Sequence, residues 1–215
     1  MTSPRSGRPS EVSQRAASLP VDFFTRPAQI VARELLGAIV VSTLGHARTA
    51  GRIIETEAYL GYDDPASHGY LGRRNDKNAA LFGVPGSWYV YRSYGLHWCA
   101  NLVCESAGRG SAVLLRALAP IDGIVTMRRR RGVVAARVPA NTAILCSGPG
   151  KLCQALGITC ALDGRMMPAS SVIIVPGEAY ADGGVDVTPR IGITKAADWP
   201  LRFVIKAETK RPPSR

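Results

Sequence analysis

Short apolar runs recur along the chain, and Gly, Pro and polar residues separate them. Runs of this kind, bounded by residues that favour turns, are typical of β-strands. They lie at residues 38–44, 51–60, 87–92, 96–104, 111–120, 171–177, 190–195 and 201–206. Several begin or end at a glycine or a proline, which suits a sheet whose neighbouring strands are joined by turns.

Two further segments predict helices. In residues 22–37, Pro27 occupies the first turn and Gly37 is a stop signal. One apolar face of this helix is expected to carry Ile30, Val31, Leu35 and Leu36. Residues 148–158 predict a second, shorter helix that also ends at a glycine. Many strands and few helices favour a single mixed α/β domain with a central, largely antiparallel β-sheet and surrounding helices.

The composition sets the domain boundaries. The chain has 215 residues, of which 46% are apolar, so one sizeable core is expected. Residues 1–19 are rich in Ser, Pro and Arg and predict a flexible basic arm, whereas residues 20–206 form the domain. Residues 207–215 predict a short basic tail.

The net charge narrows the choice of partner. Twenty-seven Lys and Arg residues against 16 Asp and Glu residues leave +11, and residues 128–131 are four consecutive arginines. Such an excess argues against a generic acidic cytosolic enzyme and favours a polyanionic partner. An anionic membrane surface would meet the same test, but no segment has the roughly 18 apolar residues that span a membrane. The first residues lack the apolar region of a signal peptide, so we expect an intracellular protein.

The cysteines predict no metal chemistry. The five cysteines form no C-x-x-C pair, and their apolar neighbours are typical of buried free thiols in a reducing compartment. Cys146, Cys153 and Cys160 recur every seven residues, but the three histidines lie far from them in the sequence. We therefore expect no metal site.

The strand at residues 51–60 carries acids on one face. With a side-chain period of two, Glu55, Glu57 and Tyr59 point one way, and Ile54, Thr56, Ala58 and Leu60 the other. One interpretation is an edge strand that its charges protect from further pairing. The alternative is a carboxylate that lines a cleft beside an aromatic wall.

Residues 87–101 predict a β-hairpin whose turn is formed by Ser93, Tyr94 and Gly95. Tyr94 then lies at the tip, where it is either an ordinary turn residue or a ring that inserts between stacked bases. Tyr91 and Asn101 lie on the two arms and point to the same side if the pairing is regular.

Two more polar residues remain ambiguous at this point. Arg116 stands alone in an apolar strand, and arginine is rarely buried without an anionic partner. It either pairs with a carboxylate such as Glu55 or faces a bound phosphate or the cleft beside Glu57. His68 either lies in a solvated loop or belongs to the site.

Four motifs in this order and spacing carry a family resemblance. GRIIETEAYLG, GSWYVYRSYGLHWCANLV, AVLLRALAP and LCSGPGKLCQALGI resemble the alkyladenine (3-methyladenine) DNA glycosylase family over residues 21–205. The resemblance implies a monofunctional base-excision repair enzyme without AP lyase activity and without a metal or organic cofactor. It implies that a protruding β-hairpin contacts the minor groove of double-stranded DNA containing damaged purines, and that the enzyme resembles small monomeric glycosylases.

The resemblance also implies roles for individual residues. Glu57 matches the catalytic acid that activates water, Arg116 matches the arginine that helps to place this water, and Ile191 contributes a backbone carbonyl there. Three residues match the walls that sandwich the extruded base: Tyr59, His68 and Tyr91. Asn101 matches the asparagine that rejects the exocyclic amine of guanine, and Tyr94 matches the tyrosine that fills the gap in the duplex.

The chain departs from the family pattern at the hairpin. Arg92 and Ser93 replace apolar residues of the vertebrate members, and His97 replaces an aromatic residue, so the hairpin is expected to hold DNA more electrostatically. If the family resemblance is set aside, the residues also fit two other functions. One is a non-catalytic nucleic-acid-binding module, and the other is a nucleoside hydrolase, which would need neither basic arms nor a wedge.

Overall fold

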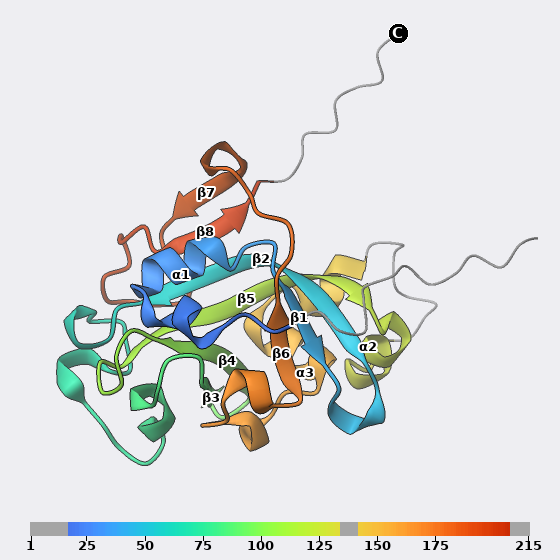
Figure 1. Ribbon diagram of the computed structural model, residues 1–215, viewed down its shortest axis with the longest axis horizontal. Helices are drawn as coiled ribbons and strands as arrows, with labels where there is room; N and C mark the ends of the chain where they lie inside the picture. The colour runs from blue at the N-terminus through green and yellow to red at the C-terminus, as the bar shows by residue number, and fades with distance from the viewer. Residues whose placement is uncertain (1–16, 134–141, 207–215) are drawn as a thin grey trace, which may run out of the picture.

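A computed structural model describes residues 17–133 and 142–206 of the chain. These residues form one sheet of eight strands in which every pairing is antiparallel, so the predicted mixed α/β class with an antiparallel sheet is confirmed (Figure 1). The strands are β1 (Ile39–Ser42), β2 (Thr49–Tyr59), β3 (Trp88–Ser93), β4 (His97–Cys104), β5 (Ser111–Asp122), β6 (Val172–Val175), β7 (Val185–Thr188) and β8 (Arg202–Ile205). Their order is β3-β4-β5-β2-β1-β6, and β8 pairs with β2 and β7.

Strand β2 lies at the centre of this sheet. It pairs with β5 along one edge, and β1 and β8 share its other edge. Strand β8 lies opposite the stretch from Glu55 to Glu57. The interpretation of the acidic strand as a charged edge is therefore wrong, because both edges of β2 are hydrogen-bonded next to these acids.

Strands β3 and β4 pair without a bulge, from Trp88 opposite Leu102 to Ser93 opposite His97. The Leu96 amide closes their turn by donating to the Ser93 carbonyl at 2.9 Å. Tyr94 adopts a φ of +48° in this turn, a left-handed conformation in which its side chain is strained. The turn thus fixes Tyr94 at the end of two regular strands.

The helices only partly match the prediction. Residues 21–37 form two pieces, η1 (Val21–Thr25) and α1 (Ala28–Glu34), instead of one helix. Arg26, which precedes a proline, is extended with φ −87° and ψ 165° because the proline ring excludes the helical conformation there. Ile30 was expected on the apolar face of this helix but is 44% exposed.

The second predicted helix is confirmed, and a further one was missed. Helix α3 (Pro149–Leu156) ends at Gly157, whose φ is +76°. Helix α2 (Ile124–Arg130) was not predicted; its last turn contains three arginines of the basic run, at the end of the helix where cations are favourable. The short 3₁₀ segments are η2 (Leu44–His46), η3 (Gly61–Asp63), η4 (Tyr70–Gly72), η5 (Ala79–Phe82), η7 (Thr142–Cys146), η8 (Cys160–Leu162), η9 (Met167–Ala169) and η10 (Asp182–Gly184).

The predicted strand at residues 190–195 is wrong. These residues lie outside the strands, and β7, which precedes them, pairs with β8 instead. Gly192 has a φ of +79°, which is incompatible with an extended strand. The Arg190 side chain and the Ile191 amide bond to partners near the end of β2. The segment is therefore a loop beside the end of β2, and it contacts that strand through Arg190 and Ile191.

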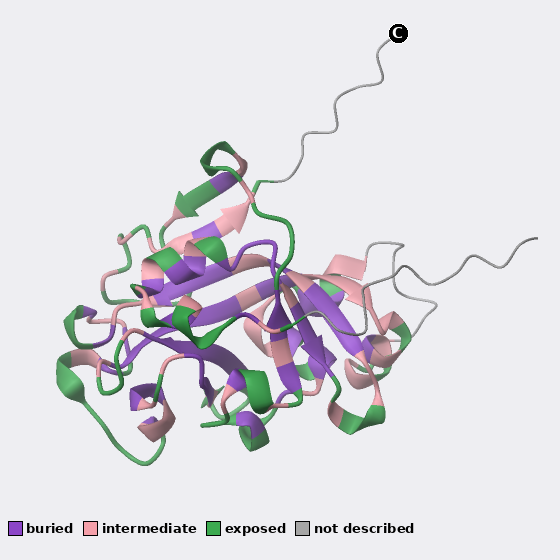
Figure 2. Ribbon diagram, in the orientation of Figure 1, coloured by how far each residue is buried: buried purple, intermediate pink, exposed green. Residues whose placement is uncertain are grey.

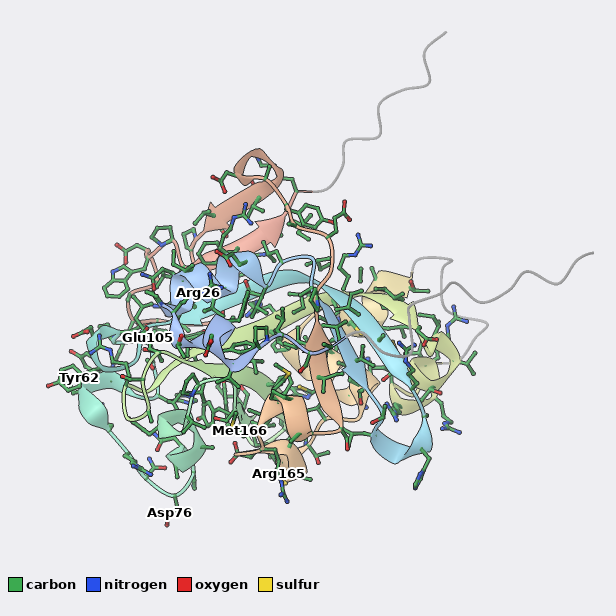
Figure 3. The ribbon with its side chains drawn as sticks, viewed as in Figure 1. Arg26, Tyr62, Asp76, Glu105, Arg165 and Met166 are labelled. Carbon is green, nitrogen blue, oxygen red and sulfur yellow. The ribbon has the colours of Figure 1, made fainter. Side chains whose placement is uncertain are left out.

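The apolar core covers one face of the central strands. The Thr56 hydroxyl donates to the Ala32 carbonyl of α1 at 2.8 Å, so α1 covers the face of β2 opposite to Glu57 (Figure 1). Buried residues follow the central strands, whereas charged side chains such as Asp76 and Arg165 lie at the periphery (Figures 2 and 3). Leu19, within the predicted basic arm, belongs to the core, and its amide donates to Ile174; the arm up to residue 16 and the tail lie outside the described residues.

The cysteines largely match the expectation of buried free thiols. All five are free and four are buried, but Cys160 is exposed. Among residues 17–133 and 142–206, no helix is long and apolar enough to cross a membrane.

Candidate active site

The sheet register aligns one residue from each of four strands. Glu57 of β2 lies opposite Leu114 of β5, Leu114 lies opposite Asn101 of β4, and Asn101 lies opposite Tyr89 of β3. Directly opposed residues of antiparallel strands point to the same face of the sheet. These residues therefore share the face that α1 leaves free.

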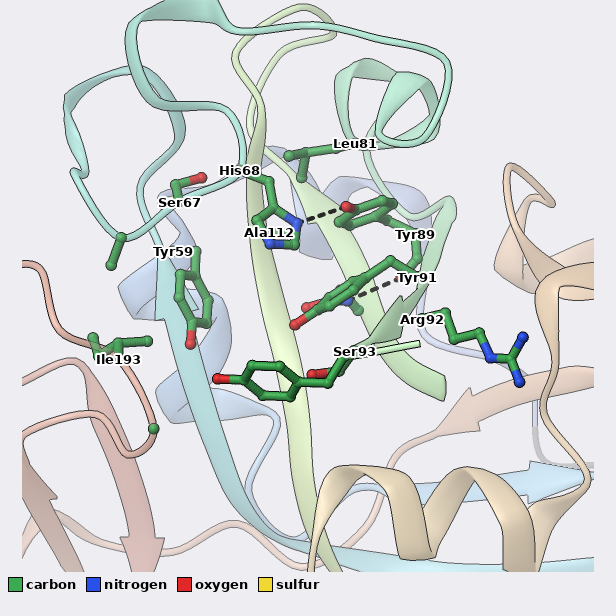
Figure 4. A pocket seen from close by; sticks show the side chains of 14 residues that line it. Tyr59, Ser67, His68, Leu81, Tyr89, Tyr91, Arg92, Ser93, Ala112 and Ile193 are labelled. Atoms are coloured by element: carbon green, nitrogen blue, oxygen red, sulfur yellow. Dashed lines mark hydrogen bonds between the residues drawn. The ribbon is translucent and has the colours of Figure 1, made fainter. Parts of the chain in front are cut away.

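A cavity of about 360 Å³ opens on this face (Figure 4). Seven residues predicted for the site line it: Tyr59, His68, Tyr91, Arg92, Ser93, Tyr94 and Asn101. Its other lining residues are Ala66, Ser67, Leu81, Tyr89, Ala112, Gly192 and Ile193. Most of the wall thus comes from the end of β2, the loop that follows it and the β3–β4 arm.

Aromatic rings form the walls of the cavity. Tyr59 lies across the hollow from His68 and Tyr91 (Figure 4). The ring centroids of His68 and Tyr91 are 4.6 Å apart, and Tyr91 stacks on Tyr89 at 5.4 Å with an interplanar angle of 25°. Electron-rich walls of this kind suit a flat, preferably cationic ligand.

Tyr89 holds His68 in place. Its hydroxyl lies 2.7 Å from His68 Nδ1, and partial burial of the ring lowers the pKa of His68. His68 thus belongs to the cavity and is not merely a solvated loop residue. Sequence analysis missed Tyr89, although its position two residues before Tyr91 in the same strand placed it on the same face.

Glu57 lies behind the Tyr59 wall, and its side chain is completely buried. The Tyr59 hydroxyl donates to Glu57 Oε2 at 2.9 Å, and the Ile191 amide donates to Oε1 at 2.8 Å. Burial raises the pKa of Glu57 above its ordinary value, whereas Arg116 and the two hydrogen bonds oppose this rise. A carboxylate with a raised pKa is a stronger base than a free one.

Arg116 contacts both acids of the strand. Its Nε lies 3.0 Å from Glu55 Oε1, and its Nη1 lies 3.5 Å from Glu57 Oε1. The predicted pairing with Glu55 is therefore confirmed, and the same guanidinium also reaches Glu57, although Arg116 does not line the cavity. Arg202 also donates to Glu55, at 2.6 Å, which leaves Arg116 positioned beside Glu57.

Ile191 reaches Glu57 through its amide, whereas the resemblance implied a role for its carbonyl. Its side chain is 50% exposed. The segment from Arg190 to Ile193 therefore contributes a backbone donor to Glu57 and part of the wall, Gly192 and Ile193, to the cavity.

Asn101 is buried at the side of the cavity formed by β4. Its Nδ2 donates to the Tyr89 carbonyl at 3.0 Å. This hydrogen bond fixes the amide, so its orientation toward a ligand is set before binding.

The turn between β3 and β4 lies at the mouth of the cavity. Tyr94 is 90% exposed and Leu96 is 72% exposed, although both are large and apolar. The guanidinium carbon of Arg92 lies 5.6 Å from the centroid of the Trp98 ring, so the charge projects beside the turn. Two large exposed side chains two residues apart, beside a cation, suit contact with a macromolecular ligand.

The methylpurine-DNA glycosylase family model matches residues 22–209. The chain belongs to this family. The match contains every residue of the cavity and of the Glu57 environment, so this methylpurine-DNA glycosylase family member is a DNA glycosylase of base-excision repair.

Bacterial relatives match over most of their length. A protein of Rhodopseudomonas palustris (strain HaA2) is 49% identical over 185 residues, which cover 86% of this chain and 85% of the relative. A protein of Agrobacterium fabrum (strain C58) is 47% identical over 186 residues, which cover 86% of this chain and 87% of the relative. A protein of Koribacter versatilis is 45% identical over 192 residues, which cover 88% of this chain and 90% of the relative. All three bear the name "Putative 3-methyladenine DNA glycosylase".

The site of this family member contains no cluster that would bind a metal. In the described parts of the chain, no three His, Cys, Asp or Glu side chains gather closely enough to hold an ion. The polar groups around Glu57 instead bond to one another.

Proposed function

We propose that the protein hydrolyses the N-glycosidic bond of alkylated or deaminated purines in double-stranded DNA and leaves an abasic site. The substrate class comprises 3-methyladenine, 7-methylguanine, hypoxanthine and etheno-adenine. One observation carries the proposal. Tyr59 lines a cavity walled by aromatic rings, and its hydroxyl also donates a hydrogen bond to the buried carboxylate of Glu57.

The damaged nucleotide rotates out of the duplex, because its glycosidic carbon is shielded inside the stack. Its base enters between Tyr59 on one side and His68 with Tyr91 on the other. Base–aromatic stacking contributes roughly 1–3 kcal/mol per base. A purine that alkylation has made cationic gains a further cation–π attraction, whereas a neutral lesion is accepted by shape.

Glu57 activates the water that attacks C1′ of the sugar. Its two oxygens have about four lone-pair sites, and Tyr59 and Ile191 use one each. A site therefore remains for a water, which Arg116 and the Ile191 carbonyl help to place. The carboxylate takes a proton from this water and stabilises the positive charge that develops on the sugar as the base leaves.

Asn101 selects against normal guanine. Because its amide is already held by the Tyr89 carbonyl, it does not move away from the exocyclic amine of guanine. The exocyclic amine would then clash with a side chain that is held in place, and such a clash lowers the affinity for guanine. Three of the four lesions lack that amine and meet no such penalty. The fourth, 7-methylguanine, carries it, but its cationic ring gains cation–π attraction and is already a good leaving group, which offsets the penalty.

Tyr94 fills the space that the extruded base leaves, and Arg92 and Ser93 contact the adjacent backbone of the minor groove. The exposure of Tyr94 at the turn supports this role. As the resemblance to small monomeric glycosylases implies, we propose that the protein acts as a monomer on intracellular DNA. Among the described residues that line the cavity there is no lysine to form a Schiff base, so we propose no AP lyase activity.

The experiment that tests this function uses four duplexes, each with one of the four lesions. We expect a free base and an abasic site whose strand breaks only after alkali treatment. Strand cleavage without alkali would contradict the monofunctional mechanism. Release from free nucleosides but not from duplexes, with no dependence on salt, would instead indicate a nucleoside hydrolase, because phosphate contacts make DNA binding salt-dependent.

A further inference from the structure

Arg190 and Asp64 form an ion pair whose two side chains are both completely buried. Arg190 Nη2 donates to Asp64 Oδ1 at 2.9 Å, and Nη1 bonds to Oδ2, so the contact is bidentate. Neither residue lines the cavity or contacts Glu57 directly. A buried pair of this kind is weak evidence for stability, because desolvation offsets the attraction, so its role has to be sought in its other contacts.

Arg190 holds the end of strand β2. Its Nη1 donates to the Ala58 carbonyl at 3.1 Å. Its guanidinium carbon lies 4.6 Å from the centroid of the Tyr59 ring, which is within the range of a cation–π contact. Arg190 therefore supports Tyr59 as a wall of the cavity and as a hydrogen-bond donor to Glu57.

Asp64 holds the loop that leads to the opposite wall. Its Oδ2 accepts from the Leu60 amide at 3.1 Å, and its Oδ1 accepts from the Ala66 amide at 3.0 Å. Its backbone carbonyl accepts from the Ser67 amide, immediately before His68. The ion pair thus connects the end of β2, which carries Tyr59, to the loop that carries His68 on the opposite wall.

Both hydrogen-bond donors to Glu57 lie next to Arg190. Tyr59 donates to one oxygen and lies against the Arg190 guanidinium, and Ile191, which follows Arg190 in the chain, donates to the other. A shift of the Arg190 side chain would move both donors together. Since Arg190 is neutralised by Asp64, its effect on Glu57 is transmitted through geometry.

We infer that Arg190 and Asp64 are positioning residues, which hold the Glu57 carboxylate and the two facing walls in the geometry that base excision requires. This inference rests on the proposed function. Errors of about 1 Å in such a geometry can lower a rate roughly 100-fold without changing the groups that react. Loss of the pair should therefore slow the chemical step more than it weakens DNA binding.

A change in the pH profile separates positioning from mere support of the fold. Hydrogen bonds to a carboxylate favour its charged form, so weaker bonds from Tyr59 and Ile191 raise the pKa of Glu57. The acid limb of the rate then moves to higher pH, because Glu57 must be ionised to act. The remaining charged and titratable groups that face it are Arg116 on β5, Glu55 on β2, Cys99 on β4 and Arg202, which lies opposite Glu57 on β8, and none of them is changed.

The test compares Arg190→Lys with Arg33→Lys. Arg33 forms an ion pair with Asp182 and bonds to the Tyr180 carbonyl, away from the residues that line the cavity. Lysine retains the charge but not the planar fork that bonds to both oxygens. We expect Arg190→Lys to lower the single-turnover release of 7-methylguanine about 10- to 100-fold. We expect less than threefold weaker binding to a duplex with a stable abasic-site analogue, about 0.6 kcal/mol, and no effect of Arg33→Lys.

A second variant excludes a trivial loss of folding. The pair Asp64→Asn and Arg190→Gln leaves no unpaired charge in the core, and rates are divided by the folded fraction measured by near-ultraviolet circular dichroism. A normal rate per folded molecule with an unmoved acid limb, in either variant, would overturn the positioning role. If the unaltered protein itself released no base, the proposed function would fail instead, so the two failures are distinguishable.

Discussion

The hydroxyl of Tyr59 donates a 2.9 Å hydrogen bond to Oε2 of Glu57, two residues earlier in the same strand. Side chains two apart in a strand share a face. The hydrogen bond therefore links Tyr59, a wall of the cavity, directly to the buried Glu57 carboxylate. Any ligand that packs on the Tyr59 ring is thereby placed next to a carboxylate that the protein shields from bulk water.

Replacement of the general base Glu57 should separate DNA binding from bond cleavage. In Glu57→Gln the side chain keeps its size but cannot accept a proton from water. We expect release of alkylated base to fall about 10²–10⁴-fold, the usual contribution of a general base. Affinity for lesion DNA should stay nearly unchanged in an electrophoretic shift assay. Full activity would remove Glu57 from the mechanism.

The rate should depend on pH in a direction that the burial of Glu57 sets. Because burial raises its pKa above the ordinary value of 4.5, the ionised form is lost at a higher pH than for a free glutamate. Release of 7-methylguanine should therefore decline on acidification with a midpoint above 4.5. A cationic base needs no further proton to leave, so protonation of the purine adds no second limb to the profile. A profile flat down to pH 4.5 would contradict the assignment.

The same burial predicts an effect on stability. With a raised pKa, the folded state binds a proton more readily than the unfolded state, so the contribution of Glu57 is present below about pH 4.5 and is lost as pH rises through the folded pKa. Glu57→Gln should therefore raise Tm at pH 8 and raise it less at pH 4. A lower Tm at pH 8, measured by calorimetry, would show that the contacts of the carboxylate outweigh its desolvation.

The exposed turn should matter most for damaged DNA. Tyr94→Ala removes a ring that stacks in the vacated space, a contact worth about 1–3 kcal/mol. We expect lesion binding to weaken by roughly 5- to 150-fold and binding to intact duplex to change little. Leu96→Ala, at the neighbouring exposed position, serves as a matched control. Equal weakening on both duplexes would make Tyr94 a general contact.

Tyr89 should act through His68. Tyr89→Phe keeps the stacked ring but removes the hydroxyl 2.7 Å from Nδ1. A hydrogen bond of this kind contributes about 1 kcal/mol, so we expect lesion DNA to bind about fivefold more weakly. Competition binding with lesion and intact duplexes measures the effect. An unchanged affinity would mean that packing alone orients His68.

Much of the fold and the site followed from local patterns. Alternation in residues 51–60 placed Glu55, Glu57 and Tyr59 on one face, and Arg116 does bridge the acids while Tyr59 bonds to Glu57. The strict alternation is wrong at Ile54, because register shifts in β2 bring Ile53 into the core in its place. The signals around residues 87–101 predicted both arms and the turn, and Tyr91 and Asn101 line the same cavity as expected. The predicted helix over residues 22–37 was wrong at Arg26, although the restriction on a residue before proline is itself a local signal.

The sequence by itself determined the strand faces, the aromatic arm and the family, because side-chain alternation, turn residues and motif spacing are properties of neighbouring positions. Only the tertiary structure decided that β2 is central, that Ile191 leaves the sheet to bond to Glu57, and that Arg190 reaches Asp64 across 126 residues of chain. Contacts between such distant residues depend on how the strands are ordered and where the chain crosses them. No periodic pattern in a short window encodes that choice.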